Sequence, residues 1–193
     1  MNITVYLGAN EGNDPCLRKA VDELGTWIGN SGNALVYGGS KGGLMGALAD
    51  SVLKAGGNVT GVEPDFFIEN EFQHDGLTKL IVTKDMSERK KMIELGEVFI
   101  AFPGGTGTLE EIAEVMSKVS LKHLDAPCIL YNLNGYYDDL KNGTPHSRYF
   151  SDELGVPIIL INTEQMFALQ RDAWYNINVN IVYYLRKKNY FRR

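Results

Sequence analysis

The sequence VFIAFPGGTGTLEE, residues 98–111, decides the fold of this chain. Residues 98–102 are apolar and β-prone, and residues 103–107 form a glycine-rich turn. The apolar residues that follow recur at the spacing of one helix face: Leu109, Ile112, Ala113, Met116 and Val119. This order predicts a strand, a turn and a helix. Because the first amides of a helix have no partners within it, the turn is suited to bind an anion, most often a phosphate.

Two carboxylates, Glu110 and Glu111, follow this turn directly. Carboxylates repel a phosphate, so their presence suggests a second task besides binding it. A structural interpretation competes with that idea. Thr108 and Glu111 have the spacing of a capping box, with Thr108 as the N-cap and Glu111 reaching back to an amide. The pattern alone leaves both interpretations open.

The rest of the chain alternates β-prone apolar runs with segments of helical periodicity. The predicted strands are residues 3–7, 34–37, 58–62, 79–83, 97–102, 127–131 and 155–161, and the predicted helices begin at Asp14, Leu44, Asp85 and Thr108. Residues 63–76 are predicted to form a long loop. Nearly unbroken apolar strands indicate a parallel sheet covered on both faces. We therefore expect one α/β domain over residues 1–193, doubly wound and Rossmann-like, with ligands beyond the carboxyl ends of its strands.

A second glycine-rich turn, GGSKGGLMG, spans residues 38–46. It lacks the middle glycine of the dinucleotide fingerprint, and Lys41 is not followed by the Ser or Thr of a Walker motif. Two interpretations remain: Gly39 and Gly42 contact a ligand, or the glycines only allow close packing of strand and helix.

Arg89 shares an apolar helix face with Met86 and Ile93. Burying a guanidinium without a partner is costly, so it needs an anion or must extend to solvent. The partner is either a structural carboxylate or a bound phosphate, for which the planar guanidinium is well suited. Lys90 would add a second cation.

Composition excludes several classes of function. The net charge of −5 gives no sign of a nucleic-acid surface. The two cysteines and three histidines have no metal or redox spacing, so no metal is predicted, and the cysteine usage suggests a reducing compartment. No leader or run long enough to span a bilayer is found. The expectation is a soluble, cytoplasmic protein with no membrane or nucleic-acid partner.

The motifs together resemble a known family. Residues 86–90 (MSERK) and 103–111 (PGGTGTLEE) resemble the paired M-x-x-R-K and P-G-G-x-G-T-x-x-E signature of the LONELY GUY (LOG) family, often labelled "lysine decarboxylase-like". Residues 38–46 match its G-G-x-x-x-G-L-M-G turn, and residues 132–138 (NLNGYYD) resemble its N-x-x-G-Y-Y-D segment. The similarity extends from residue 2 to about residue 141, and the C-terminal part beyond it is atypical.

Members of that family activate cytokinins by hydrolysing the N-glycosidic bond of a nucleoside 5′-monophosphate to free base and ribose 5-phosphate. The resemblance implies a homodimer with its active site near the subunit interface, and a purine nucleotide as substrate, with AMP and N6-substituted adenine nucleotides as candidates. It places the substrate on Glu71, Arg89, Lys90, Gly104, Gly105, Thr106, Gly107, Thr108 and Glu110. Glu111 matches the final glutamate of the motif.

The chemistry agrees with this assignment. Cleavage of a ribosyl–base bond develops positive charge at C1′, which a carboxylate such as Glu111 stabilises, while Arg89 holds the phosphate. This reaction needs neither a metal nor an organic cofactor. A nucleotide-binding sensor or carrier without turnover remains the alternative. A decarboxylase has little support, because no lysine lies in a recognisable pyridoxal phosphate site.

Three residues depart from the family pattern. Ser87 stands where many members have His, and Lys118 and Ser120 stand where plant-like members carry Trp and Gln. The last two are predicted to lie on the helix toward the base pocket, so the identity of the base stays open.

Overall fold

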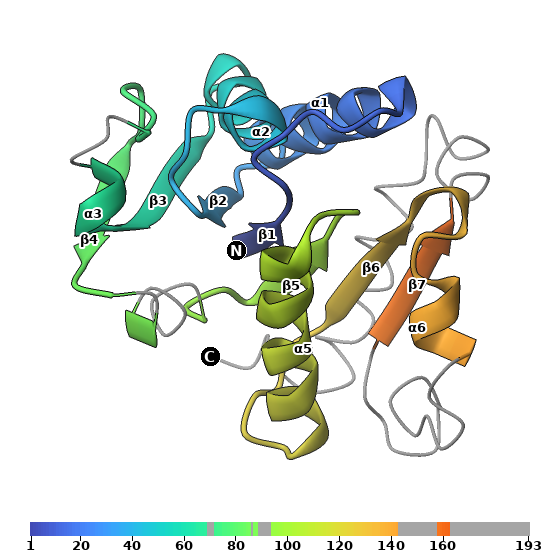
Figure 1. Ribbon diagram of the computed structural model, residues 1–193. Helices are drawn as coiled ribbons and strands as arrows, with labels where there is room; N and C mark the ends of the chain where they lie inside the picture. Colours follow the sequence, from blue (N-terminus) through green and yellow to red (C-terminus); the bar gives the residue numbers. More distant parts are fainter. Residues whose placement is uncertain (69–71, 86, 89–93, 143–157, 163–193) are drawn as a thin grey trace.

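A computed structural model describes residues 1–68, 72–85, 87–88, 94–142 and 158–162 (Figure 1). Its strands are β1 (Asn2–Tyr6), β2 (Ala34–Tyr37), β3 (Asn58–Pro64), β4 (Lys79–Thr83), β5 (Val98–Ala101), β6 (Cys128–Asn132) and β7 (Ile158–Asn162). Its helices are α1 (Pro15–Asn30), α2 (Gly43–Lys54), α3 (Asp65–Ile68), α5 (Thr106–Ser120) and α6 (Asp138–Asn142), with the 3₁₀ turn η1 (Leu133–Gly135). None of the described helices is long and apolar enough to cross a membrane.

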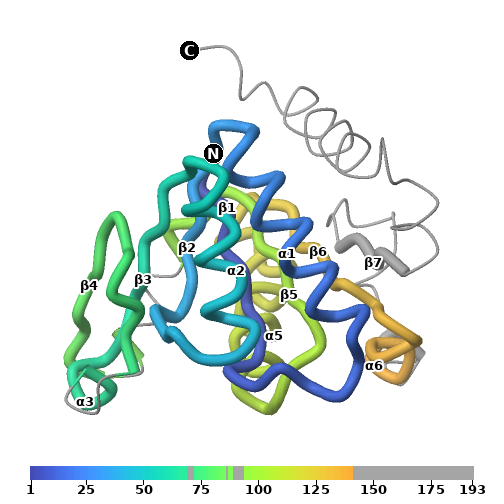
Figure 2. The backbone as a smooth tube through the Cα atoms, turned by 90° about the horizontal axis from the view of Figure 1, so that it is seen from above, coloured from blue at the N-terminus to red at the C-terminus, as the bar shows by residue number. Residues whose placement is uncertain are grey.

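The strands form one seven-stranded sheet in the order β4-β3-β2-β1-β5-β6-β7, and every pair is parallel (Figure 2). The chain moves outward from β1 to β4, and then returns to place β5 on the other side of β1. Such a reversal leaves a crevice at the carboxyl ends of the two central strands, where doubly wound proteins bind ligands. The predicted doubly wound α/β fold is confirmed.

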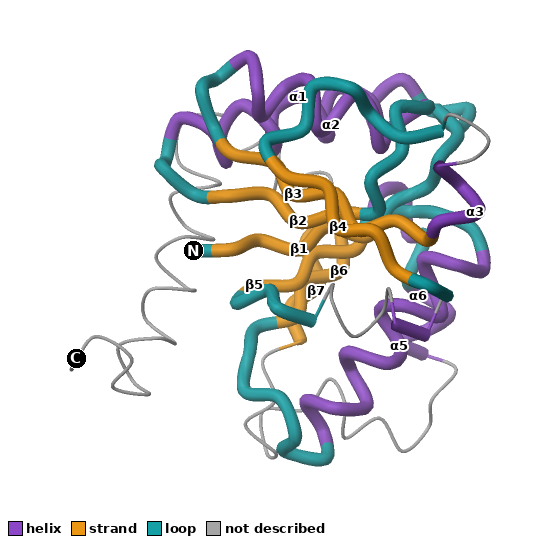
Figure 3. Tube along the Cα trace, turned by 90° about the vertical axis from the view of Figure 1, so that its left-hand side faces the viewer, coloured by secondary structure: helices purple, strands orange, loops and turns teal. Residues whose placement is uncertain are grey.

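Helices cover both faces of the sheet (Figure 3). On one face, Ile3 and Val5 of β1 pack in a core cluster with α1 and α2. On the other face, Tyr6 and Phe99 belong to a second cluster with α5. Because successive strand residues point to opposite faces, the apolar runs are buried on both sides.

The start of α1 agrees with the sequence. Asp14 is the N-cap, its carboxylate Oδ1 accepts a hydrogen bond from the Cys16 amide at 2.8 Å, and Pro15 is the first helical residue. The same carboxylate also accepts a hydrogen bond from Asn134 Nδ2 through Oδ2 at 2.6 Å. Asp14 therefore both begins α1 and links it to the segment after β6.

The predicted start of α5 is wrong by two residues. The helix begins at Thr106, and its N-cap is Gly105, which makes no side-chain hydrogen bond to the helix. Thr108 is thus the third helical residue and is buried beneath Gly104, where a Cβ on Gly104 would lie 2.3 Å from its hydroxyl oxygen. The capping box of Thr108 and Glu111 is therefore excluded.

The buried face of α5 is also rotated from the predicted one. Leu109 is 47% exposed and Ala113 is exposed. The residues that face the sheet are Thr108, Ile112, Val115, Met116 and Val119. The predicted and the observed faces share Ile112, Met116 and Val119. The observed face also contains Thr108, which fits closely under Gly104.

The predicted loop over residues 63–76 is wrong in its first part. β3 continues through Glu63 and Pro64, which pair with Val82 and Thr83 of β4, and α3 follows. The strand was not predicted this far because a glutamate is rarely buried, and Glu63 is only 2% exposed.

Two other predicted segments are described only in part. Of the helix predicted from Asp85, Ser87 and Glu88 are described as helical, and the Glu88 amide donates to Asp85 Oδ1 at 2.8 Å. The last predicted strand appears as β7. Residues 143–157 lie outside the described residues.

The two cysteines are expected to react very differently. Cys16 is exposed and Cys128 is buried, and burial raises the pKa of the Cys128 thiol to about 12. At pH 8 we expect Cys16 to react with a disulfide reagent in the native protein and Cys128 only after unfolding. Since the folded pKa of Cys128 lies above the unfolded value, the stability that depends on its protonated thiol is complete below pH 9 and is lost as pH rises toward 12. Equal reaction rates for both thiols in the native protein would contradict this burial.

Candidate active site

A cavity of about 580 Å³ opens at the carboxyl ends of β1, β2, β3 and β5. Its volume is in the range of small-molecule sites. The lining residues come from the loops after these strands and from the start of α5: Leu7, Gly8, Ala9, Asn10, Gly12, Leu17, Gly38, Ser40, Leu44, Met45, Glu63, Phe67, Phe72, Pro103, Gly104, Gly105, Gly107, Thr108, Glu110 and Glu111. The crevice expected from the strand order is therefore present as a cavity.

The start of α5 supplies amide groups to this cavity. Gly105, Gly107 and Thr108 line it, and the first hydrogen bond of the helix is donated by the Leu109 amide to the Gly105 carbonyl at 3.1 Å. The amides before Leu109 have no acceptor within the helix, and the Gly105 cap brings no side-chain oxygen to satisfy them. Uncapped amides at the positive end of a helix dipole favour a bound anion.

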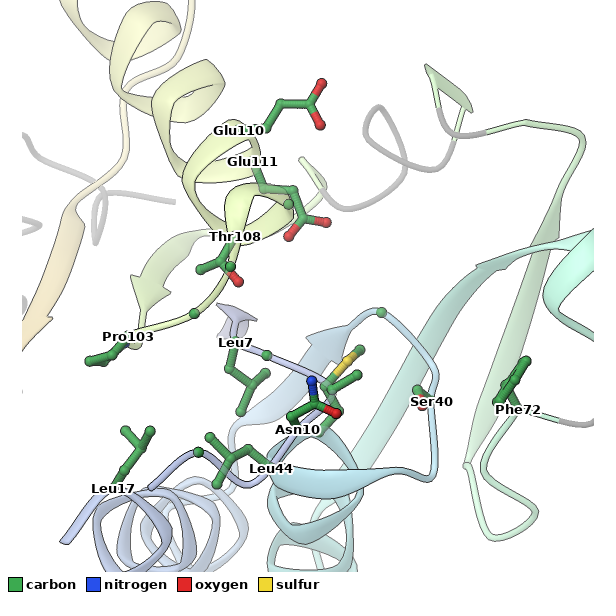
Figure 4. Close-up of a pocket in the computed structure, with 18 of the residues that line it drawn as sticks. Leu7, Asn10, Leu17, Ser40, Leu44, Phe72, Pro103, Thr108, Glu110 and Glu111 are labelled. Atoms are coloured by element: carbon green, nitrogen blue, oxygen red, sulfur yellow. The ribbon is translucent and has the colours of Figure 1, made fainter. Parts of the chain in front are cut away.

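Carboxylates lie around the same cavity. Glu111 and Thr108 face the space above Leu7 and Asn10, whereas Glu110 extends outward from the helix (Figure 4). Glu63 lines the cavity from the end of β3. The described lining residues include no lysine or arginine. A phosphate bound here would therefore need a cation from another part of the chain or from a second chain.

Tyr6 lies at the end of β1, close enough to Glu111 to be affected by its charge. Burial, and next the negative charge of Glu111, raise the pKa of the Tyr6 hydroxyl. Its ring stacks on Phe99 with the centroids 6.4 Å apart. Tyr6 therefore keeps its proton in the field of the Glu111 charge.

The structure brings together six of the residues predicted to act, and all six line the cavity: Gly104, Gly105, Gly107, Thr108, Glu110 and Glu111. Thr106 begins α5 but is not among the lining residues. Gly39 and Gly42 lie in the turn between β2 and α2, which lines the cavity through Gly38 and Ser40. Glu71, Arg89 and Lys90 lie outside the described residues, so their predicted roles stay predictions.

Sequence reasoning missed Asn10 and Glu63 in the cavity. Asn10 lies in the loop after β1, and Glu63 lies near the end of β3. The only signal in the sequence for a site role was that both residues lie at or just beyond the carboxyl end of a strand. Within the described residues, no three His, Cys, Asp or Glu side chains gather as metal ligands would.

Lys118 and Ser120 do not line this cavity. They lie at the C-terminal end of α5, opposite to the end that does. Lys118 Nζ pairs with Glu94 and, at 3.1 Å, with Glu114, and the Ser120 hydroxyl donates to the Ser117 carbonyl at 2.8 Å. The described cavity therefore gives no support to the expectation that they face a base pocket.

Sequence relatives identify the family. A family model described as "Possible lysine decarboxylase" matches residues 45–149. A cytokinin riboside 5′-monophosphate phosphoribohydrolase of Rhodococcoides fascians is 43% identical over 148 residues, covering 76% of this chain and 75% of that protein. The chain belongs to the LONELY GUY (LOG) family. An Arabidopsis thaliana LOG protein of the same name is 38% identical over 139 residues, which are 72% of this chain and 65% of that protein.

Solved structures share the fold of this chain. The molybdenum cofactor binding protein of Rippkaea orientalis has a TM-score of 0.66 at 25% identity, over 94% of this chain and 96% of that one. The molybdenum cofactor carrier protein of Chlamydomonas reinhardtii has a TM-score of 0.60 at 23% identity, over 83% of this chain and 89% of that one. The second likeness shows the fold alone.

Proposed function

We propose that this LOG-family chain hydrolyses the N-glycosidic bond of a purine nucleoside 5′-monophosphate to the free base and ribose 5-phosphate. The observation that carries the proposal is the position of Glu111 in one cavity with the uncapped amides of α5. Relatives that are named phosphoribohydrolases support the reaction type. The phosphate would bind at the start of α5, which leaves the ribose C1′ within reach of the glutamate.

The reaction follows from this arrangement. The bond between C1′ and the purine nitrogen breaks, and its electron pair leaves with the base. Water adds a hydroxyl group to C1′, and its proton is balanced by protonation of the base. Glu111 stabilises the positive charge that develops at C1′ or accepts the proton of the water. The phosphate anchors the far end of the substrate and so positions the sugar.

Arg89 and Lys90 would supply the missing positive charge, and Glu71 would contact the substrate. The described cavity lining has three carboxylates, Glu63, Glu110 and Glu111, and no lysine or arginine. An anionic substrate needs compensating cations in such surroundings. The family signature assigns that role to Arg89, supported by Lys90.

A homodimer would cover apolar side chains that are exposed in the single chain. Leu95, Leu109 and Leu121 are 58%, 47% and 62% exposed, respectively. Leu109 lies on α5 within the family motif, which supports an interface near the active site. The free thiols of Cys16 and Cys128 support the predicted reducing, cytoplasmic compartment.

An assay over a panel of nucleotides tests the proposal. Purified protein is incubated with AMP, N6-substituted AMP, GMP, CMP and adenosine, and free base is separated by chromatography. We expect base and ribose 5-phosphate in equal amounts from a purine monophosphate, and much less base from adenosine, which has no phosphate to anchor. Absence of base from every nucleotide would refute the proposed function.

The second candidate is a carrier or sensor that binds a phosphorylated ligand without turnover. The likeness in fold to a molybdenum cofactor binding protein favours it. In that case AMP or another phosphorylated ligand would raise the melting temperature, and no ribose 5-phosphate would form over hours. The decarboxylase description has less support, because the described cavity lining contains no lysine that could hold pyridoxal phosphate.

A further inference from the structure

The segment between β6 and α6 binds the glycine-rich stretch between β5 and α5 from outside the cavity. The Tyr136 hydroxyl donates to the Gly104 carbonyl, and the Tyr137 hydroxyl donates to the Phe102 carbonyl at 2.8 Å. Both acceptors belong to the stretch that connects β5 to α5. Two tyrosines that follow the turn by more than thirty residues therefore bind alternate carbonyl groups of it.

Asn132 fixes this segment in place. Its Oδ1 accepts a hydrogen bond from the Tyr137 amide at 2.6 Å, and its Nδ2 donates to Asp138 Oδ1 at 2.7 Å. Asn132 is buried, with 6% of its surface exposed. The two tyrosine rings meet edge to face with centroids 4.9 Å apart. The loop that carries the Tyr136 hydroxyl is therefore held by hydrogen bonds and a ring contact.

The bond from Tyr136 determines where one amide of the turn points. The Gly104 carbonyl and the Gly105 N–H belong to the same peptide unit, and the described chain has no cis peptide. In a planar trans peptide these two groups point in opposite directions. Gly104 lines both the main cavity and a neighbouring groove, whereas Tyr136 lines only the groove and Gly105 only the main cavity. A carbonyl held toward the groove leaves the amide directed at the cavity.

We propose that Tyr136 is a positioning residue for the substrate phosphate: its hydroxyl holds the Gly104 carbonyl outward, so that the Gly105 amide donates to the phosphate. The inference rests on the phosphate site of the proposed function. Tyr137 has a different part, because it is buried and its loss would disturb the second core cluster. Tyr136 is 52% exposed, so removal of its hydroxyl should leave the fold intact.

The test is Tyr136→Phe, with binding of ribose 5-phosphate measured by calorimetry. Loss of one positioned amide should weaken ribose 5-phosphate binding about tenfold and raise the KM for AMP by a similar factor, with kcat changed less. Binding of adenosine, which lacks the phosphate, should change less than twofold, and the melting temperature should stay the same.

Asn134→Gly is the matched control. It removes a side-chain hydrogen bond to Asp14 from the same loop, and glycine accepts the positive φ of 48° at this position. This variant should bind ribose 5-phosphate like the wild type. The inference is overturned if Tyr136→Phe binds ribose 5-phosphate as the wild type does, or if the substitution weakens adenosine binding as much as ribose 5-phosphate binding. It is also overturned if the wild type does not bind ribose 5-phosphate. A wild type that binds ribose 5-phosphate but never releases a base refutes only the proposed hydrolase.

Discussion

Glu111→Gln should lower kcat for purine nucleotide hydrolysis by about 10²- to 10⁴-fold, the usual contribution of a positioned acid–base group. Glutamine keeps the size and polarity of the side chain but removes the negative charge that faces the cavity. The positive charge at C1′ then loses its stabilising partner. Binding of AMP should change less than turnover and should not weaken, because one repulsion with the phosphate disappears. Steady-state release of base and calorimetry of AMP binding measure the two effects separately.

Glu114→Gln is the control for this variant. Glu114 lies on the same helix, three residues further on, where it pairs with Lys118 and does not line the cavity. It should retain wild-type turnover. Because the capping box is excluded, loss of activity in Glu111→Gln cannot be ascribed to a lost helix cap. A Glu111→Gln protein that folds normally and releases base at the wild-type rate would show that Glu111 is not catalytic.

Gly43→Ala should lower the free energy of unfolding by about 3 kcal/mol, as strained and overpacked substitutions do. Gly43 begins α2 with a φ of +51°, which an L side chain rarely adopts. An added Cβ would lie 2.0 Å from the Ala9 carbonyl oxygen, which is backbone and cannot rotate away. Ala9 and Asn10 line the cavity, so ligand binding should weaken as well. Urea unfolding followed by circular dichroism measures the change in stability.

The neighbouring Gly42→Ala provides the comparison. A Cβ on Gly42 would meet the Ala9 carbonyl oxygen and the Ser40 hydroxyl oxygen at 3.6 Å, an ordinary contact, and its φ of −84° suits alanine. Since Gly42 is the N-cap of α2, a cost below about 1 kcal/mol is expected. If the two variants unfold at the same urea concentration, the close approach of Gly43 to the loop after β1 is wrong.

Local patterns in the sequence were sufficient for most elements. Asp14 and Pro15 predicted the start of α1, because a helix cap depends on hydrogen bonds between residues two or three apart. The apolar runs predicted strands buried on both faces, and the glycine turn before Glu110 predicted an anion site at a helix start. The α1 cap and the strands are confirmed, because these interactions join residues that are close in sequence, whereas the anion site stays a prediction.

The failures occurred where distant residues compete with local ones. Thr108 and Glu111 have the spacing of a capping box, yet the N-cap of the helix is Gly105. Contacts from the segment after β6, through Tyr136 and Tyr137, hold the turn in its observed shape. Glu63 looked like a loop residue, but pairing with β4 makes it part of a strand. Neither the two tyrosines nor β4 could be identified as partners from the residues next to the turn and to Glu63.

The sequence by itself determined the parallel α/β architecture and the glycine-rich turn with two carboxylates beside it, since these depend on periodicity and on residue chemistry. Only the tertiary structure decided that Glu111 faces a cavity instead of capping a helix, that Asn10 and Glu63 join it there, and that Tyr136 holds the turn. The physical reason is the strand order. The order in which strands are added reverses at β1, which brings the loops after β1, β3 and β5 around one crevice. Residues more than a hundred positions apart in the chain therefore lie in the same site.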